Sequence, residues 1–208
     1  MDKAALVFMF ITFGTANHVP RSELQNSIPG LASQKPAFCN GMDCPEFTVV
    51  KSTKDYEIRD YVATDWVSTD QLNMEYKEAW SKNFMKLSQY ISGQNDKMQK
   101  VAMTFPVVTR IIPGQESNFR MNFFVAPAQK PAPKPTNPEV FLQSIPTLRV
   151  YARRVAGYAR DYPVWKDEAV KLEEALTKDG LEFVTEKWWT ASYDAPFNRH
   201  NEVIFMAK

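Results

Sequence analysis

Histidine is scarce in this sequence of 208 residues, and its scarcity excludes several kinds of catalytic site. Only His18 and His200 occur, and His18 lies in a polar segment that precedes the expected folded domain. The sequence also lacks G-x-S-x-G, H-E-x-x-H and P-loop motifs. With one histidine in the domain and no assignable nucleophile beside it, no catalytic triad is predicted. We therefore expect a binding protein and not an enzyme.

An excess of either charge is also missing. The chain has 25 lysines and arginines against 24 acidic residues, a net charge of +1, and it has no long run of one sign. Proteins that bind nucleic acid or anionic membrane surfaces usually carry such a basic excess or run. The apolar run at residues 4–13 is shorter than the roughly 20 residues that a transmembrane helix needs. The sequence predicts neither a nucleic-acid partner nor stable insertion into a membrane.

The same apolar run is typical of a secretory signal peptide. Lys3 precedes it, and the small residues Gly14 to Ala16 follow it at the positions that a signal peptidase reads. We expect residues 1–16 to be removed and the protein to be secreted to the extracellular space. The alternative interpretation is a short buried helix.

Cysteine is limited to Cys39 and Cys44, spaced C-x4-C with Gly41 between them. In a secreted chain this spacing favours a local disulfide, with a stabilisation at the low end of roughly 2–4 kcal/mol. Two thiols alone do not complete a tetrahedral metal site; the remaining alternative is two free thiols. We expect residues 17–44 to form a loosely ordered lead-in and residues 45–208 to form the domain.

Two segments show the apolar spacing that a helix produces. The stripe of the first consists of Tyr76, Trp80, Phe84, Leu87 and Ile91. The stripe of the second consists of Trp165, Ala169, Leu172 and Leu176. Gly93 ends the first helix, and Pro163 and Gly180 bound the second.

Strand-like segments flank both helices. They are residues 47–50, 56–59, 63–68, 107–112, 119–125, 147–154, 157–159, 183–192 and 201–207. A proline-rich stretch at residues 126–138 predicts an extended surface loop. The order strands, helix, two strands occurs twice, which indicates an internal duplication. We predict an α+β fold, a distorted and partly closed antiparallel β-barrel with two helices, built from two strand–helix–strand–strand halves.

Several dispersed motifs form a set from about Tyr56 to the C-terminus. They are Tyr56-Glu57-Ile58-Arg59-Asp60-Tyr61, Trp66-Val67-Ser68-Thr69, Tyr90-Ile91-Ser92-Gly93-Gln94-Asn95-Asp96-Lys97, Met103-Thr104-Phe105-Pro106-Val107, Tyr193-Asp194-Ala195-Pro196 and Arg199-His200-Asn201-Glu202-Val203. Together they resemble the SOUL/heme-binding-protein family over roughly three quarters of the chain. The resemblance implies a distorted β-barrel with two helices and a repeated half. It also implies binding of heme and other tetrapyrroles.

The resemblance further implies two modes of ligand binding. In one branch of the family the ligand lies in an apolar groove beside the first helix and the last loop. In the other branch a histidine in an R-H-Y segment is the proposed iron ligand. This sequence has Asp60 at that position, and a carboxylate is a poor substitute for imidazole on heme iron. We expect heme as the cofactor, without histidine ligation at position 60.

In the first helix, the resemblance places Phe84 and Ser88 at ligand-facing positions, with Gln89 as the neighbouring polar position. Phe84 also lies on the apolar stripe of that helix, so the alternative is that it belongs to the core. Ser88 is smaller and more polar than the residues that the family tends to carry there.

In the final loop, three residues are candidates for heme binding. Phe197 would stack on the porphyrin, with a plug at the barrel end as the alternative. Arg199 would bind a propionate through two hydrogen bonds, with an ion pair to Glu202 as the alternative. His200 would reach the iron, with a hydrogen-bonded histidine at the start of a strand as the alternative.

These expectations combine into one functional hypothesis. The protein binds heme or a related tetrapyrrole outside the cell, as a carrier or scavenger, as a monomer and without catalysis. The alternative is a protein-interaction module on the same fold, in which the groove or the proline-rich loop takes a protein partner.

Overall fold

Nine strands and two helices make up the part of the chain that the computed structural model describes, residues 36–114, 118–157, 159, 161–193 and 200–208. The helices are α1 (Tyr76–Ile91) and α2 (Tyr162–Lys178), and the 3₁₀ turns are η2 (Ala37–Cys39) and η3 (Pro127–Gln129). The strands are β1 (Phe47–Ser52), β2 (Glu57–Tyr61), β3 (Thr64–Leu72), β4 (Val107–Ile112), β5 (Asn118–Phe124), β6 (Val140–Ile145), β7 (Leu148–Val155), β8 (Trp188–Ser192) and β9 (Asn201–Met206). No helix in these ranges is long and apolar enough to cross a bilayer. The predicted signal peptide lies outside the described residues.

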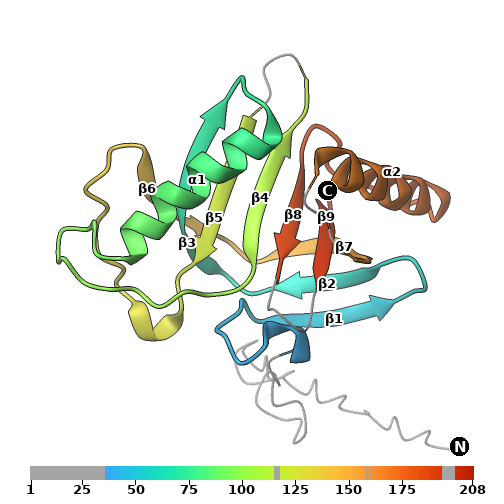
Figure 1. Ribbon diagram of the computed structural model, residues 1–208. Helices are drawn as coiled ribbons and strands as arrows, with labels where there is room; N and C mark the ends of the chain where they lie inside the picture. The colour runs from blue at the N-terminus through green and yellow to red at the C-terminus, as the bar shows by residue number, and fades with distance from the viewer. Residues whose placement is uncertain (1–35, 115–117, 158, 160, 194–199) are drawn as a thin grey trace, which may run out of the picture. The chain divides into compact units, whose positions relative to one another are not determined.

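The strands form one antiparallel sheet in the order β1-β2-β7-β9-β8-β4-β5-β3-β6 (Figure 1). The segment β3-α1-β4-β5 contributes the neighbours β4-β5-β3, and the segment β7-α2-β8-β9 contributes β8-β9-β7 in the same arrangement. The two halves meet where β4 pairs with β8. The predicted α+β fold with a repeated strand–helix–strand–strand half is therefore confirmed.

Two short connections force this sheet to curl. Residues 62–63 join β2 to β3, and residues 146–147 join β6 to β7. In each case the joined strands lie six positions apart in the sheet order, which in a flat sheet would be roughly 29 Å. Two residues span at most about 10 Å. The sheet must therefore bend until its two ends approach each other, which produces the partly closed barrel.

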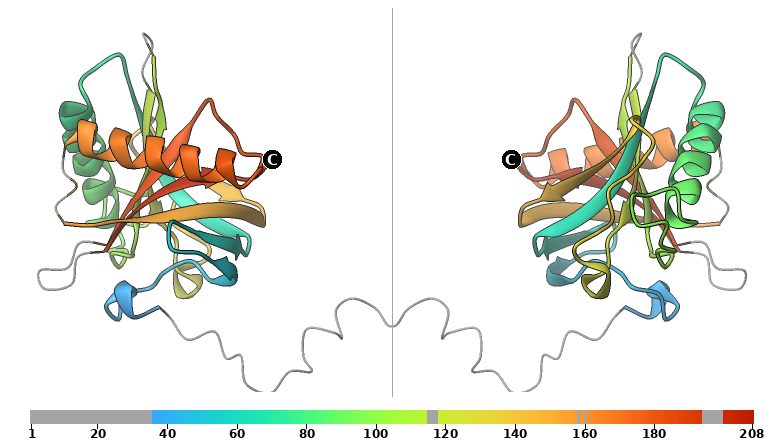
Figure 2. Two further views of the ribbon diagram at one scale, coloured as in Figure 1. Left: turned by 90° about the vertical axis from the view of Figure 1, so that its right-hand side faces the viewer. Right: turned by 90° about the vertical axis from the view of Figure 1, so that its left-hand side faces the viewer.

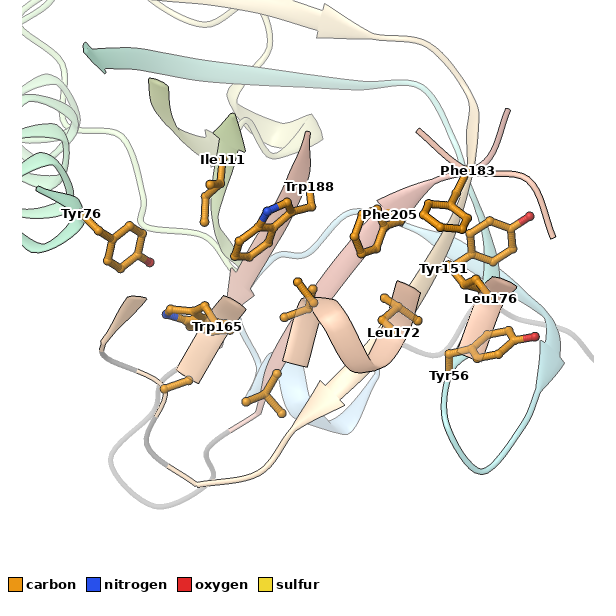
Figure 3. Packing of buried hydrophobic residues seen from close by; sticks show 14 of the residues in the cluster. Tyr56, Tyr76, Ile111, Tyr151, Trp165, Leu172, Leu176, Phe183, Trp188 and Phe205 are labelled. Carbon is orange, nitrogen blue, oxygen red and sulfur yellow. The ribbon is translucent and has the colours of Figure 1, made fainter. Parts of the chain in front are cut away.

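Both helices cover the same face of the sheet, which we call the outer face (Figure 2). Helix α1 packs on β3 and β5, and α2 packs on β7 and β9. Figure 3 shows Trp165 and Leu172 of α2 pointing toward Trp188 and Phe205 of the sheet. The predicted stripe of α2 is confirmed, because all four of its members are buried: Trp165, Ala169, Leu172 and Leu176.

Helix α1 has the predicted extent, but its buried stripe is rotated from the predicted one. Tyr76 and Leu87 are buried as expected, whereas Trp80 and Phe84 are only half-buried. The buried positions are Tyr76, Ala79, Asn83, Leu87 and Tyr90. Asn83 faces the sheet because its side-chain amide donates a hydrogen bond of 2.8 Å to the carbonyl of Phe119.

Three details of the strand prediction are wrong. Strand β6 follows the proline-rich stretch directly and was not expected. The strand expected at residues 183–192 begins only at Trp188, and no strand forms at Gly157 and Ala159, the described residues of the segment 157–159. The proline-rich loop itself is anchored to α1, because the Tyr90 hydroxyl donates to the carbonyl of Pro133 at 2.8 Å.

We predict that Leu172→Ala lowers the free energy of unfolding by about 2–5 kcal/mol, because Leu172 is fully buried under α2 and the substitution leaves a cavity. Val170→Ala on the exposed side of the same helix is the matched control, expected to change stability by less than about 0.5 kcal/mol. Urea unfolding followed by circular dichroism measures both. Equal effects of the two substitutions would contradict the packing described for α2.

Candidate functional site

The face of the sheet opposite the helices, the inner face, encloses a cleft of about 370 Å³. Residues from eight of the nine strands line it, because the curl of the sheet brings both ends of the strand order around it. We call this space the inner cleft. A cleft of this size with a mostly apolar surface is a usual place for a small apolar ligand.

Strand alternation decides which side chains reach the inner cleft. In β4, Val107, Thr109 and Ile111 are buried toward the helices, whereas Val108 and Arg110 line the cleft. The same alternation holds along the other strands. The apolar side chains that line the cleft include Trp66, Val108, Ile145, Leu148, Val150, Trp189, Ile204 and Met206. Most of them stay half-buried, so apolar surface is left open to a ligand.

One part of the inner cleft is polar and basic. Arg110 and Arg120 line it, and Arg120 makes two hydrogen bonds of 2.7 Å to the carboxylate of Asp70. Arg110 lies farther from that carboxylate, at 3.9 Å, and donates to Asn118 at 2.9 Å. Burial and the neighbouring charge of Arg120 lower the pKa of Arg110. Lys187 also lines the cleft.

Beside the cleft lies a buried ion pair. Arg59 of β2 donates two hydrogen bonds, of 2.7 and 2.9 Å, to the carboxylate of Glu202 in β9, and the two side chains are 4% and 1% exposed. The Nε2 atom of His200 lies 2.6 Å from the same carboxylate. Burial opposes ionisation of Glu202, but the hydrogen bond from His200 and the charge of Arg59 outweigh it and lower the pKa of the carboxyl group.

Two tyrosines lie between this ion pair and the cleft. Tyr61 and Tyr193 both line the cleft. Burial raises the pKa of Tyr61 to about 12 and the pKa of Tyr193 well above its ordinary value. Both phenols therefore stay protonated at neutral pH.

Cys39 and Cys44 form the predicted disulfide. The loop that it closes packs against Ala191 and Tyr193, and the ring of Phe38 stacks on the His200 imidazole at 4.0 Å between centroids. The lead-in was expected to be loosely ordered up to residue 44. Its residues 36–44 contact the C-terminal part of the chain, because the disulfide packs on Ala191 and Tyr193 and Phe38 stacks on His200.

The candidate residues of the first helix lie away from the inner cleft. Phe84 stacks on Trp80 at 5.0 Å and contacts Phe123 edge to face, so it belongs to the outer-face core. Ser88 and Gln89 line a depression at the end of α1 that is open to solvent and also includes the exposed side chains of Met85 and Met98. The structure therefore does not bring these three candidates together with a walled apolar site.

The candidates near the C-terminus divide into two groups. Phe197 and Arg199 lie outside the described residues. His200 is buried between Phe38 and Glu202, in the hydrogen-bonded arrangement that was the alternative to an iron ligand. Glu202 is paired with Arg59, a partner that was not considered. No group of three or more histidine, cysteine, aspartate or glutamate residues within the described ranges is placed to hold a metal ion.

Asp60 lies on the outer face of β2, opposite to the cleft. Its carboxylate makes two hydrogen bonds, of 2.7 and 2.8 Å, with Arg149 of β7, and both side chains are about half exposed. The two hydrogen bonds lower the pKa of Asp60. By strand alternation its neighbours Arg59 and Tyr61 point to the inner side, so position 60 does not face the cleft.

Sequence reasoning missed the residues that line the inner cleft. Trp66, Arg110, Arg120 and Trp189 are its most distinctive side chains, and none was a candidate. The available signal was the period of two in β4, where Val108 and Arg110 alternate with Val107, Thr109 and Ile111. That pattern shows two faces but does not show that the polar face is enclosed.

Comparison with known proteins gives consistent matches over most of this chain. A protein-family model described as SOUL heme-binding protein matches residues 42–206. Heme-binding protein 2 of Homo sapiens is 32% identical over 161 residues, which cover 74% of this chain and 78% of that protein. Heme-binding protein 1 of Xenopus tropicalis is 29% identical over 139 residues, which cover 63% of this chain and 72% of that protein.

A solved structure shares the fold at low sequence identity. The crystal structure of the EcmrR C-terminal domain matches with a TM-score of 0.54 at 11% identity, covering 74% of this chain and 98% of that domain. This similarity concerns the arrangement of helices and strands alone.

We predict that Glu202→Gln destabilises the protein by about 3–5 kcal/mol at neutral pH, because it removes the buried carboxylate from Arg59 and leaves it with the partly exposed Glu57, 2.8 Å from its Nε, as its ion-pair partner. Asp60→Asn removes an exposed ion pair and is expected to cost no more than about 1 kcal/mol. Chemical unfolding of the two variants and the wild type measures the difference. A cost for Glu202→Gln as small as that of Asp60→Asn would contradict a stabilising role for this pair.

The pH dependence of the same variant follows from the pKa of Glu202. Since folding lowers that pKa from its ordinary value of 4.5, the pair stabilises the fold above about pH 4.5 and loses this effect as the pH falls through the lowered pKa. The stability gap between wild type and Glu202→Gln should therefore narrow below pH 4.5. A gap that stays constant from pH 7 to pH 3 would contradict the lowered pKa.

Proposed function

This chain belongs to the SOUL heme-binding protein family, and we propose that it binds heme or a related tetrapyrrole in the inner cleft, outside the cell and without catalysis. The observation that carries the proposal is a walled apolar cleft with Trp66 and Trp189 on its lining and a pair of arginines at one part of it. A tetrapyrrole is flat and apolar, and heme carries propionate groups at one edge. The lining therefore matches the two chemical parts of such a ligand.

The described residues offer surface for the macrocycle, but none of them is a histidine placed to ligate the iron. Asp60 points to the outer face, and the His200 imidazole contacts Phe38 and Glu202. Bound heme would supply its own ring surface and iron. The chain's residues would bury that surface and pair with its carboxylates, so we expect binding that does not depend on an imidazole bond to the iron.

The magnitude of this burial sets the expected affinity. Burying about 400 Å² of a porphyrin at roughly 25 cal/mol per Å² gives about 10 kcal/mol before the cost of association. Association costs on the order of 4–15 kcal/mol. The apolar contact alone therefore leaves at most about 6 kcal/mol, which corresponds to a Kd of roughly 40 μM, so we expect modest affinity, in keeping with a carrier or scavenger that releases its ligand.

The inner cleft is preferred to the groove beside α1. Phe84 packs on Trp80 and Phe123, and the depression that contains Ser88 and Gln89 is more open to solvent than the inner cleft. The protein-interaction alternative would need an exposed apolar surface of its own. Val49 and Val50 of the edge strand β1 are such residues, and binding of a protein there is the second outcome to be tested.

The extracellular part of the proposal is supported by two features. Residues 4–13 with their small-residue flank fit a signal peptide. The disulfide between Cys39 and Cys44 is of a kind that persists in oxidising compartments.

For ligand binding, we predict that hemin added to residues 17–208 produces a saturable change in the Soret band. Trp189→Ala should weaken the apparent affinity by about tenfold, because apolar contact surface in the cleft is lost. Phe84→Ala, on the outer face, is the control and should leave the affinity within about twofold once thermal unfolding shows that it is folded. Weakening by Phe84→Ala alone would move the ligand to the α1 groove, and loss only with His200→Ala would indicate iron ligation.

If hemin produces no saturable change, heme is not the ligand, and the protein-interaction alternative is favoured. Affinity capture with the β1 surface intact and with Val50→Lys would then locate the partner site. A partner lost only in Val50→Lys would support that alternative.

For export, we predict that the full chain expressed in a eukaryotic secretory cell appears in the medium with Asn17 as its first residue. Intact-mass measurement identifies the cleavage site. A control chain with Val7→Glu and Phe10→Glu, which interrupts the apolar run, should stay inside the cell. Retention of the unaltered chain with residues 1–16 attached would contradict the proposed export.

A further inference from the structure

A row of charged and aromatic side chains crosses the inner face. Arg110 of β4 pairs directly with Arg120 of β5 in the strand register. On one side Arg110 is opposite Trp189 of β8, and on the other side Arg120 is opposite Asp70 of β3. Since neighbouring strands lie about 4.8 Å apart, these four side chains form one continuous row along the cleft.

Two cations directly opposite each other across a strand pair are destabilising. Asp70 offsets this repulsion only in part, because its single negative charge accepts two hydrogen bonds from Arg120 and lies 3.9 Å from Arg110. The row therefore holds two guanidinium groups for one carboxylate. Lys187, which also lines the cleft, adds a third cation.

Arg110 has hydrogen-bonding capacity that the fold does not use. Its side chain is 17% exposed and donates to Asn118, while its Nε atom is buried without a hydrogen-bond partner among the described residues. A buried donor that lacks a partner is costly to keep. Of the buried side-chain atoms without a partner among the described residues, this Nε atom is the one that belongs to a residue lining the cleft.

We infer that Arg110, with Arg120 and Lys187, forms a carboxylate-binding end of the inner cleft, and that Asp70 is a positioning residue that holds Arg120. The ligand class is an apolar molecule that carries a free carboxylate, because a planar guanidinium matches a carboxylate with two parallel hydrogen bonds. Trp189 lies beside the guanidinium and provides an apolar surface for the body of the same ligand. This inference rests on the proposed function, since it assigns the end of the tetrapyrrole that the cleft recognises.

The test compares protoporphyrin IX with its dimethyl ester, which has the same ring but no free carboxylate. Fluorescence titration of the secreted form, residues 17–208, measures both affinities. The wild type should bind the free acid at least about tenfold more tightly than the ester. Arg110→Gln should lose about tenfold in affinity for the acid and stay within about twofold for the ester.

Arg149→Gln is the matched control, because Arg149 is an exposed arginine of the outer face. It should bind both porphyrins as the wild type does. A second readout needs no ligand: Arg110→Gln removes a like-charge contact, so its thermal midpoint should equal or exceed that of the wild type. A lowered midpoint would mean that Arg110 is structural and would overturn the inference.

The outcomes separate the inference from the proposed function. Equal affinity for acid and ester, unchanged by Arg110→Gln, would overturn the carboxylate end and leave tetrapyrrole binding in place. If neither porphyrin binds, the tetrapyrrole proposal fails, and 11-(dansylamino)undecanoic acid serves as a second apolar carboxylate probe. Binding of this probe that is lost in Arg110→Gln would support the carboxylate end, and no binding would overturn it.

Discussion

The two-residue connections at 62–63 and 146–147 are the constraint on which the rest of the structure depends. Each joins strands that lie six positions apart in the sheet, so the sheet cannot remain flat. Each connection also places a strand beside the half of the molecule to which it is not directly joined. Strand β2 leads into β3 but pairs with β7, and β6 leads into β7 but pairs with β3. The curl that results leaves an outer face for the helices and an inner face around a cleft.

Stability and recognition are divided between these two faces. The outer face is covered by α1 and α2 and holds the large apolar clusters. The inner face keeps tryptophans half exposed and sets Arg110 opposite Arg120, neither of which favours folding. The buried pair of Arg59 and Glu202 links β2 to β9 beside the cleft. The outer face therefore stabilises the fold, whereas the inner face keeps side chains that lower stability but suit ligand binding.

Local sequence patterns predicted the helices of this protein but not the contacts around its candidate site. The apolar spacing and the glycines at 93 and 180 predicted both helices closely, since a helix records its buried face every three to four residues. Strand β6 was not predicted because it pairs with β3, a strand far from it in the sequence. Family resemblance directed attention to Phe84 and His200, but their contacts with Trp80 and Glu202 depend on packing between distant segments.

The sequence by itself determined the family, the fold class with its repeated half, both helices and the disulfide between Cys39 and Cys44, because each of these is recorded in short motifs, spacings or composition. Tertiary structure alone decided that Asp60 faces away from the cleft, that Arg59 is the partner of Glu202, and that Arg110 stands opposite Arg120. The physical reason is the strand register. A shift of one residue moves every side chain of a strand to the other face, and the register is set by contacts between strands far apart in the chain.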